Sequence, residues 1–458
     1  MSDEAHAAER QATFREVFGQ PEYRAVYLAS TLSWLGDYLA KAALTVLVYD
    51  QTKSVAMSAA AFAVSYLPWL LGGPLLATMA ERYPYRTVMV TCDLVRMTLV
   101  GTIALLPLPA PVVLVVIFLN TLASPPSQAA RSALLPLILG GDRLVVGLSV
   151  NLTTGQAAQV LGYVAGAGIA AVNPRLALAI DASTYAASAV LIRLGVRARP
   201  SAMTKAHRSH LLRETADGFR MVFQTPVLRS IAVLVFAAML FAVVPEGLAA
   251  AWATSLSDSE AQRGISQALI MAASPAGFII GGLVTARLIR PDLRRALIRP
   301  FAVLAPLSLV PALLGPSAVG IAVMAGVCGF AVAGMMPAAN GLFVQALPHG
   351  FRARAFGVMQ SGTQVMQGAA VLATGLLAEH NSIPTVVGLW SLAGVGLILL
   401  ACTQWPRADR FNAAVAVATH TQPADASRID IPVHQNGANQ GETSKIVERL
   451  RLPGKIER

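Results

Sequence analysis

The chain has 458 residues, of which 55% are hydrophobic and only 13% are charged. A soluble domain carries about 25% charged residues, so this composition excludes an ordinary soluble enzyme or binding domain. The net charge of +11 is compatible with nucleic-acid binding, but the basic residues lie in short segments between apolar stretches. That distribution favours contact with an anionic membrane face instead.

Apolar stretches recur from Tyr23 to Trp405, and at about 20 residues each is long enough to cross a bilayer as a helix. A helix is required there because an unpaired strand leaves its backbone groups without partners in lipid. We therefore predict an all-α integral membrane protein with about twelve transmembrane helices, at residues 25–49, 55–79, 87–106, 111–138, 145–171, 175–195, 228–252, 264–288, 297–315, 317–346, 355–378 and 384–405.

These spans divide the chain into five parts. The polar start contains Asp3 and Glu4, so no cleavable signal peptide is expected. In the central connection, apolar Phe219, Met221 and Val222 predict a helix that lies on the membrane surface. The predicted parts are a cytoplasmic N-terminal segment (1–24), an N-terminal six-helix bundle (25–195), a cytoplasmic linker (196–227), a C-terminal six-helix bundle (228–405) and a cytoplasmic tail that is mostly disordered (406–458).

Lysine and arginine are distributed unequally between the two sets of connections. One set is rich in arginine, whereas the other holds only Lys53, Arg175 and Arg263. The rich side is predicted to be cytoplasmic by the positive-inside rule, and an even number of spans then places both termini inside. We expect a multi-pass protein of the cell membrane.

The two halves of the chain repeat with a shift of about 209 residues. Under this shift Gly72-Gly73 falls on Gly281-Gly282, Arg86 on Arg295, and Asp37 on Glu246. Six spans in each half keep both repeats in the same orientation, which is a parallel repeat. Two parallel six-helix halves are typical of a transporter, although glycine pairs also coincide by chance in a chain rich in alanine and glycine.

A family resemblance lies in the connection between the second and third spans. Residues 79–86 read M-A-E-R-Y-P-Y-R, which resembles the L-A-D-R-x-G-R-R loop signature of the major facilitator superfamily. Arg82 and Arg86 match, whereas Glu81 replaces Asp, Pro84 replaces Gly and Tyr85 replaces Arg. The resemblance implies a transporter in which Glu81, Arg82 and Arg86 have a gating role.

The resemblance extends over residues 14–405. The segments at 14–18, 33–37, 130–136 and 244–248 are similar to the bacterial exporter branch of the superfamily, which includes enterobactin-exporter-like and macrolide-efflux-like proteins. This similarity implies export, and it does not identify a substrate.

Charged residues within spans are candidates for function, because each costs about 2.5–3.5 kcal/mol on insertion scales. Asp37 lies near the middle of the first span, and Lys41 is four residues further on, where the two side chains can meet. Asp37 is interpreted either as a carboxylate that carries the coupling proton or as one half of a static ion pair. The ion pair is the favoured role of Lys41.

Glu246 follows Pro245 in the seventh span. Proline removes a backbone donor and can break the helix, and broken helices at pseudo-symmetric positions mark transporter sites. Glu246 is therefore the second candidate for proton coupling, although spans that contain proline also occur without such a role.

Three further charges, Asp93, Arg96 and Arg131, lie toward the cytoplasmic ends of the third and fourth spans. Together with Glu81, Arg82 and Arg86, they are predicted to form a charge network that holds the cytoplasmic side shut. Anchoring at the membrane edge is the alternative role of these three. Asp181, in the sixth span, has no assigned partner.

The fifth and eleventh spans carry amide side chains along one face. Such groups often form hydrogen bonds between helices, worth about 0.6 kcal/mol each, and we favour that role slightly over contact with substrate. The candidates for lining a substrate cavity are Asn151, Gln156, Gln159, Gln360, Gln364 and Gln367.

The sequence gives no sign of catalysis. It lacks a phosphate-binding glycine-rich loop and any cluster of histidine and cysteine, and its three cysteines, Cys92, Cys328 and Cys402, fall in apolar spans. No metal, no cofactor and no enzymatic activity are expected.

The function predicted from these observations is secondary active transport by a monomer. We expect proton-coupled efflux of a small apolar or amphipathic molecule, such as a drug, a secondary metabolite or a siderophore, by alternating access. The expected partners are this substrate, protons and the lipid bilayer. Import by the same fold is one alternative, and a receptor or scaffold without transport is another.

Overall fold

The computed structural model describes residues 13–69, 83–140, 142–199, 211–347, 352–406, 409 and 411. Every regular element among these residues is a helix. Most of the predicted tail (406–458) and the loop residues Glu81 and Arg82 lie outside the described residues.

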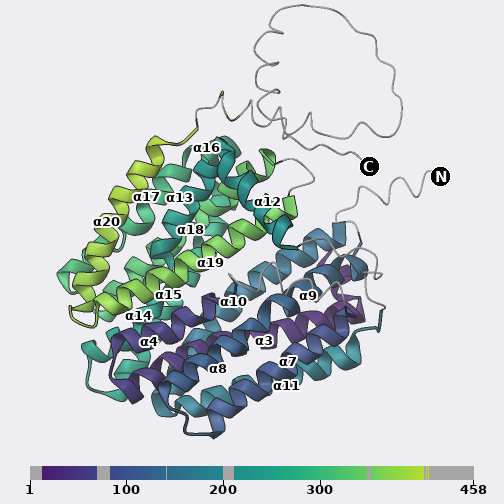
Figure 1. Ribbon diagram of the computed structural model, residues 1–458, viewed down its shortest axis with the longest axis horizontal. Helices are drawn as coiled ribbons and strands as arrows, with labels where there is room; N and C mark the ends of the chain where they lie inside the picture. The colour runs from purple at the N-terminus through teal and green to yellow at the C-terminus, as the bar shows by residue number, and fades with distance from the viewer. Residues whose placement is uncertain are drawn as a thin grey trace, which may run out of the picture. The chain divides into compact units, whose positions relative to one another are not determined.

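The first half begins with a short helix and continues with long helices (Figure 1). The second and fourth spans are each divided, the fourth at Ala123, which precedes the sequence Ser124-Pro125-Pro126. The elements are α2 (Phe14–Phe18), α3 (Pro21–Thr52), α4 (Val55–Ala63), the 3-10 helix η1 (Val64–Tyr66), α7 (Tyr85–Leu105), α8 (Ala110–Leu122), α9 (Ser124–Ile138), α10 (Asp142–Val172) and α11 (Pro174–Gly195).

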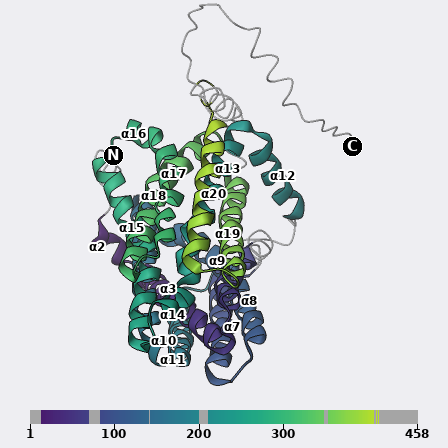
Figure 2. The same ribbon diagram turned by 90° about the vertical axis from the view of Figure 1, so that its left-hand side faces the viewer.

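The second half is preceded by α12 (Leu211–Gln224), which lies in the predicted linker and packs against α13 and α19 (Figure 2). Val222 on this helix is buried. The other elements are α13 (Pro226–Ala242), α14 (Val244–Leu256), α15 (Glu260–Leu288), α16 (Pro291–Ala296), α17 (Ile298–Leu307), η2 (Val310–Leu314), α18 (Ala318–Gln345), α19 (Arg352–Leu377) and α20 (Ile383–Thr403).

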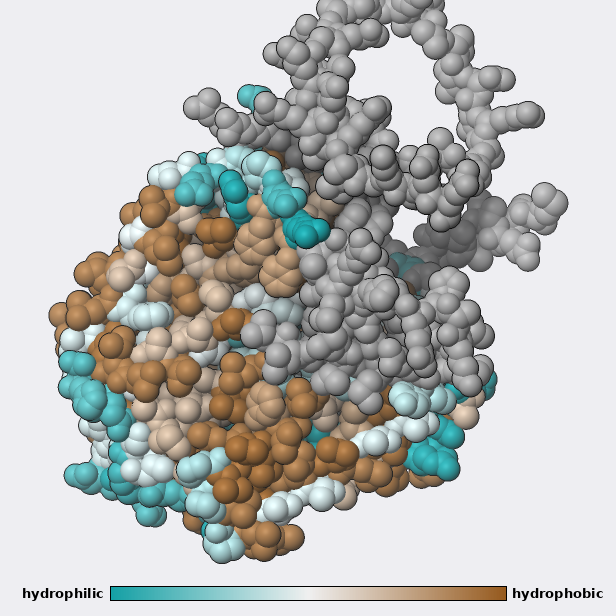
Figure 3. Space-filling view, viewed as in Figure 1, coloured by the Kyte–Doolittle hydropathy of each residue, from teal (hydrophilic) through white to brown (hydrophobic). Residues whose placement is uncertain are grey.

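The lengths of these helices suit a membrane. Eight helical stretches of the described residues are long and apolar enough to cross it, and Val55–Tyr66 and Ile298–Leu314 are shorter apolar helices. The 32-residue α3 and the 26-residue α19 are as long but more polar. Hydrophobic side chains also cover much of the outer surface, as expected for contact with lipid (Figure 3). The prediction of an all-α membrane protein with about twelve spans is confirmed.

The bounds of the elements repeat between the halves. Helix α11 begins at Pro174 and α20 begins at Ile383, which is a shift of 383 − 174 = 209 residues. The joined span α8–α9 begins at Ala110 and α18 begins at Ala318, which is a shift of 318 − 110 = 208 residues. The shift found from isolated residues therefore also relates whole helices.

Among the described residues, the two halves meet mainly along two pairs of helices, and α14 of the second half also contacts α3 and α4 of the first. Helix α10 of the first half packs against α15, and α4 packs against α19 (Figure 1). We call this boundary the seam. We call the helix ends near Arg86, Arg197 and Arg290 the arginine-rich end, and those near Lys53 and Arg263 the arginine-poor end.

Candidate functional site

The seventh span is broken beside its acidic residue. Helix α13 ends at Ala242, Val243 has φ −114° and ψ 5°, and α14 begins at Val244. Pro245 is tolerated in the first turn of α14, where a backbone N–H has no helical partner. Glu246 lies in the same turn, where the helix dipole favours a negative charge. The helix is thus interrupted at Val243, two residues before Pro245, in line with the local break that a proline can cause.

Glu246 reaches across the seam. Its side chain is only 2% exposed, and its Oε2 accepts a hydrogen bond of 3.1 Å from the hydroxyl of Tyr163 on α10. A buried carboxylate needs such partners because burial removes its hydration. The carboxylate of one half is therefore held in part by the other half.

Lys41 faces aromatic rings. Its Nζ lies 5.8 Å from the ring centre of Tyr38, 5.3 Å from that of Phe62 and 4.6 Å from that of Tyr66. Aromatic faces attract a cation by about 0.5–2 kcal/mol each. Lys41 also interacts electrostatically with Glu246 and Asp37, but neither acid lies within ion-pair distance of it in the structure. The expected Asp37–Lys41 ion pair is therefore absent.

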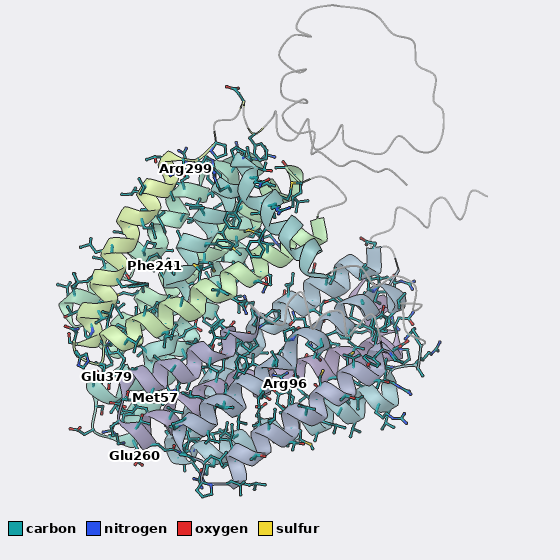
Figure 4. All side chains as sticks on the ribbon, in the orientation of Figure 1. Met57, Arg96, Phe241, Glu260, Arg299 and Glu379 are labelled. Atoms are coloured by element: carbon teal, nitrogen blue, oxygen red, sulfur yellow. The ribbon has the colours of Figure 1, made fainter. Side chains whose placement is uncertain are left out.

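The partner of Asp37 is Arg96. The Arg96 guanidinium donates through Nη2 to Asp37 Oδ1, and the hydroxyl of Tyr185 donates to the same oxygen. The guanidinium also lies over the Tyr185 ring, 4.3 Å from its centre. Asp37 lies on α3, Arg96 on α7 and Tyr185 on α11, so three helices of the first half meet at this contact. Figure 4 labels Arg96 among these helices.

Asp93 and Arg131 also lie inside the first half. Asp93 is fully buried and accepts a hydrogen bond of 2.6 Å from the hydroxyl of Ser188. Arg131 is 9% exposed and lies over the ring of Trp34, at 5.6 Å from its centre. This burial, and that of Arg96, favours a role inside the bundle over anchoring at the membrane edge. Arg96 binds Asp37 of the first span, and the predicted network with Glu81 and Arg82 lies outside the described residues.

Of the three predicted gating residues, Arg86 is the one that lies among the described residues. Its Nη1 donates to the backbone oxygen of Val196, just beyond α11, at 3.3 Å. Its counterpart Arg295 donates through Nη2 to Oε1 of Gln345, at the end of α18, also at 3.3 Å. Each arginine thus joins helix ends within its own half, and Glu81 and Arg82 lie outside the described residues.

The amide side chains do not form one cluster. Gln367 contacts Sδ of Met239 at 3.6 Å, whereas Gln360 is exposed and Gln364 is half-buried. On α10, Gln159 interacts with the Tyr163 hydroxyl. The remaining candidates on α10 are Asn151, whose Oδ1 has no partner among the described residues, and Gln156, which is half-buried.

Other seam contacts come from residues that the sequence patterns did not single out. Gln267 of α15 donates to the backbone oxygen of Ala42 at 3.1 Å. Glu379 Oε2 accepts from Ala56 N at 2.9 Å and from Ser54 Oγ at 3.0 Å, which satisfies the free N–H groups of the first turn of α4. Figure 4 labels Glu379 near Met57 of that turn.

Of these residues, Tyr163 could have been found from the sequence, since it lies four residues after Gln159 and continues the polar stripe of α10. Gln267 had a weaker signal, as an amide within an apolar span. Glu379 had none, because a cap supplied from another half depends only on tertiary packing.

The hollows at the seam and outside it differ in size and lining. One of about 80 Å³ lies at the arginine-poor end of the seam, beside Asp50, Arg263 and Gln267, and is smaller than the roughly 300–1,000 Å³ of small-molecule sites. The other, of about 590 Å³, is an apolar groove between α15, α17 and α18. It includes none of the polar residues described above, and its apolar lining is what a face toward lipid would present.

The part of the chain that the structure describes contains no group of three or more His, Cys, Asp or Glu side chains that could hold a metal ion. The charged residues described above instead bind one another and aromatic rings, as the cation–π contacts of Lys41 illustrate.

Comparison with known proteins decides the family. The sequence profile of the Major Facilitator Superfamily matches residues 26–371. The chain belongs to this superfamily. It is therefore a multi-pass membrane transporter and not an enzyme. No curated protein matches the sequence of this transporter.

Solved structures share the fold of the transporter. A mutant form of the nucleoside transporter NupG is 15% identical, with a TM-score of 0.69 over 84% of this chain and 100% of the other. The peptide transporter POT in complex with sulfate is 16% identical, with a TM-score of 0.65 over 90% of this chain and 99% of the other. A POT family transporter in complex with 5-aminolevulinic acid is 12% identical, with a TM-score of 0.63 over 87% and 98%. Similarity at this level shows the fold and not the substrate.

Proposed function

We propose that the transporter exports a small apolar or amphipathic molecule in exchange for protons, by alternating access. The observation that carries the proposal is the contact of Glu246 with Tyr163 across the seam, with Lys41 nearby. A carboxylate in this place changes its surroundings whenever the two halves move relative to each other. Proton binding and movement of the halves are then linked.

Protonation of Glu246 would weaken the seam. The neutral acid no longer attracts Lys41, and it accepts a weaker hydrogen bond from Tyr163 than the carboxylate does. Lys41 keeps its aromatic neighbours in either state. Loss of the charge therefore favours separation of the halves at this point, and return of the charge favours closure.

Contacts at the arginine-poor end support a state that is closed on that side. Glu379 and Gln267 join the halves there, whereas the described contacts of Arg86 and Arg295 stay within one half. By the positive-inside rule the arginine-rich end faces the cytoplasm. The substrate site would then open to the cytoplasm, as an exporter requires for loading.

The substrate class follows from the aromatic face of α3. Tyr27, Trp34, Tyr38 and Lys41 lie along one side of this helix and are partly buried. Rings of this kind bind apolar and flat amphipathic molecules, while a few amide groups fix their orientation. Gln156 and Gln364, which the repeat relates, are proposed as such groups.

The experiment that tests the proposal is an accumulation screen. Cells with and without the transporter are exposed to a panel of dyes, drugs and metabolites, and the cell contents are compared. Export predicts lower accumulation of some compounds, which rises again when the proton gradient is collapsed. Higher accumulation in cells with the transporter would show import, and equal accumulation of all compounds would contradict the proposal.

The orientation is tested separately. We propose a monomer in the cell membrane with both termini in the cytoplasm. Single cysteines introduced near positions 205 and 430 should resist a membrane-impermeant thiol reagent in intact cells, whereas one at Asp258 should react. Labelling at position 430 from outside would overturn this orientation, and labelling of all three positions in opened cells serves as the control.

A further inference from the structure

Asp181 on α11 is an acid without an ion-pair partner among the described residues. Its side chain is 1% exposed, and its Oδ1 is 3.4 Å from the hydroxyl of Thr184. Its Oδ2 is buried and has no hydrogen-bond partner in the same part of the chain. A charged carboxylate is very unfavourable in such a place, whereas a protonated one is tolerated and can use its O–H as a donor.

Close packing places Asp181 next to Asp37. Helix α11 crosses α3 at Gly36, where an added Cβ would overlap both Asp181 Oδ1 and the Thr184 hydroxyl. Only glycine leaves room for these side chains. Asp181 is thus held against the residue that precedes Asp37 in the chain.

Asp181 belongs to a cluster of charges around Arg96 that does not balance if every acid is ionised. Helix α3 contributes Asp37, α7 contributes Asp93 and Arg96, α9 contributes Arg131, and Tyr185 lies on α11 itself. On α10, Tyr163 faces Glu246 instead. Three carboxyl groups thus share two guanidinium groups, so 3 − 2 = 1 proton gives a neutral cluster. Lys41 of α3 interacts with both Asp37 and Glu246, and adding the opposite charges of Lys41 and Glu246 leaves the count unchanged.

The contacts indicate which acid holds that proton. Asp37 binds Arg96 directly, and Asp93 accepts a hydrogen bond from Ser188 and is electrostatically attracted to Arg131. Among the described residues, the direct contact of the Asp181 side chain is the weak one with Thr184. We propose that Asp181 is a proton-binding site of the transporter and that it competes with Asp37 for Arg96.

The proposed step is a simple proton release. The O–H bond of the Asp181 acid breaks, the proton leaves to water on the side to which the site is open, and a carboxylate remains. Arg96, the cation that interacts electrostatically with Asp181, moves toward this new charge, which weakens its contact with Asp37. This inference rests on the proposed proton coupling and adds a second proton site in the interior of the first half.

Infrared spectroscopy of the purified transporter tests the proton directly and needs no substrate. A protonated carboxyl group has a C=O stretching band that a carboxylate lacks. We expect a component of this band at neutral pH in the parent protein, absent from Asp181→Asn and retained in Asp258→Asn, in which an exposed acid is replaced. Asp181→Glu should keep a component at a shifted frequency, which covers the case that the amide variant does not fold.

An unchanged acid band in Asp181→Asn would overturn the inference. It would also be overturned if the difference spectrum between the parent and this variant showed the loss of a carboxylate band. Loss of the component in Asp93→Asn instead would assign the proton to the other acid and would also overturn it.

Flux in proteoliposomes separates this inference from the proposed function. With a compound identified by the accumulation screen, Asp181→Asn should keep substrate exchange, while its accumulation under an imposed pH difference should fall to the level without a gradient. Full pH-driven accumulation in this variant would contradict the role of Asp181 and would leave the proposed function intact. Absence of pH-driven flux in the parent would contradict the proposed function, while the infrared result would still decide the protonation of Asp181.

Discussion

Asp37 and Glu246 occupy equivalent places in the two halves, since 246 − 37 = 209, yet their surroundings differ. Both direct partners of Asp37, Arg96 and Tyr185, belong to its own half. Glu246 accepts a hydrogen bond from Tyr163 of the opposite half and also interacts with Ser274 of its own half. Motion of the halves as rigid bodies would leave the first set of contacts intact and alter the second.

Residues at equivalent positions of a sequence repeat therefore do not need to have the same role. An acid bound within one bundle stabilises that bundle, whereas an acid at the seam responds to the state of the whole protein. We therefore expect substitution at the seam to affect coupling most, and substitution within the first half to affect folding as well.

The largest effect is expected for Glu246→Gln. The amide keeps the size of the side chain but cannot bind or release a proton, so accumulation driven by a pH difference should fall by at least about tenfold, a change of about 1.4 kcal/mol in the driving step. Substrate exchange without a gradient should persist. Flux in proteoliposomes measures both, with Glu260→Gln as a control on an exposed acid. Accumulation at the parent's level would remove Glu246 from the coupling mechanism.

Asp37→Asn should mainly lower stability. The side chain of Arg96 is 7% exposed, and without the carboxylate of Asp37 its guanidinium becomes a buried charge without an ion-pair partner, at a cost of about 3 kcal/mol. Thermal unfolding in detergent, followed by tryptophan fluorescence, should show a clear decrease in Tm. Glu246→Gln should change Tm less. A larger decrease in the seam variant would reverse the comparison between the two acids.

Glu379→Ala is expected to have the smallest effect. The N–H of Ala56 and the hydroxyl of Ser54 hold the pKa of Glu379 below its usual 4.5. Since the folded pKa is lowered, the contact is present at neutral pH and is lost as the pH falls below about 4.5. Its removal should let the arginine-poor ends separate more often, with little change in Tm.

Spin labels at Thr52→Cys and Asn381→Cys measure this separation, because both positions flank the contact between Glu379 and α4. The distance distribution should broaden toward longer values in Glu379→Ala, and in the parent protein at acidic pH. Asp258→Asn, at the same end, should leave it unchanged. An identical distribution in Glu379→Ala would show that the contact does not hold the halves together.

Much of the fold was predictable because the membrane restricts it strongly. Apolar stretches had to be helical, and their lengths set the number of spans. The break near Pro245 was expected because proline lacks a backbone donor. The partners of the charged residues were less predictable. Lys41 was placed on the same face of α3 as Asp37, and the structure turns it toward Phe62 and Tyr66.

The sequence by itself determined the class of the protein, the positions of its spans, the repeat and the superfamily, because each depends on hydropathy or on residues close in the chain. Only the tertiary structure decided which charges meet. Arg96 lies 59 positions from Asp37, and Tyr163 lies 83 positions from Glu246. These pairs depend on how each helix is rotated about its axis and on which helix packs beside it. The rotation and the neighbours of each helix result from the packing of many side chains together, so they cannot be predicted from any short stretch of the sequence.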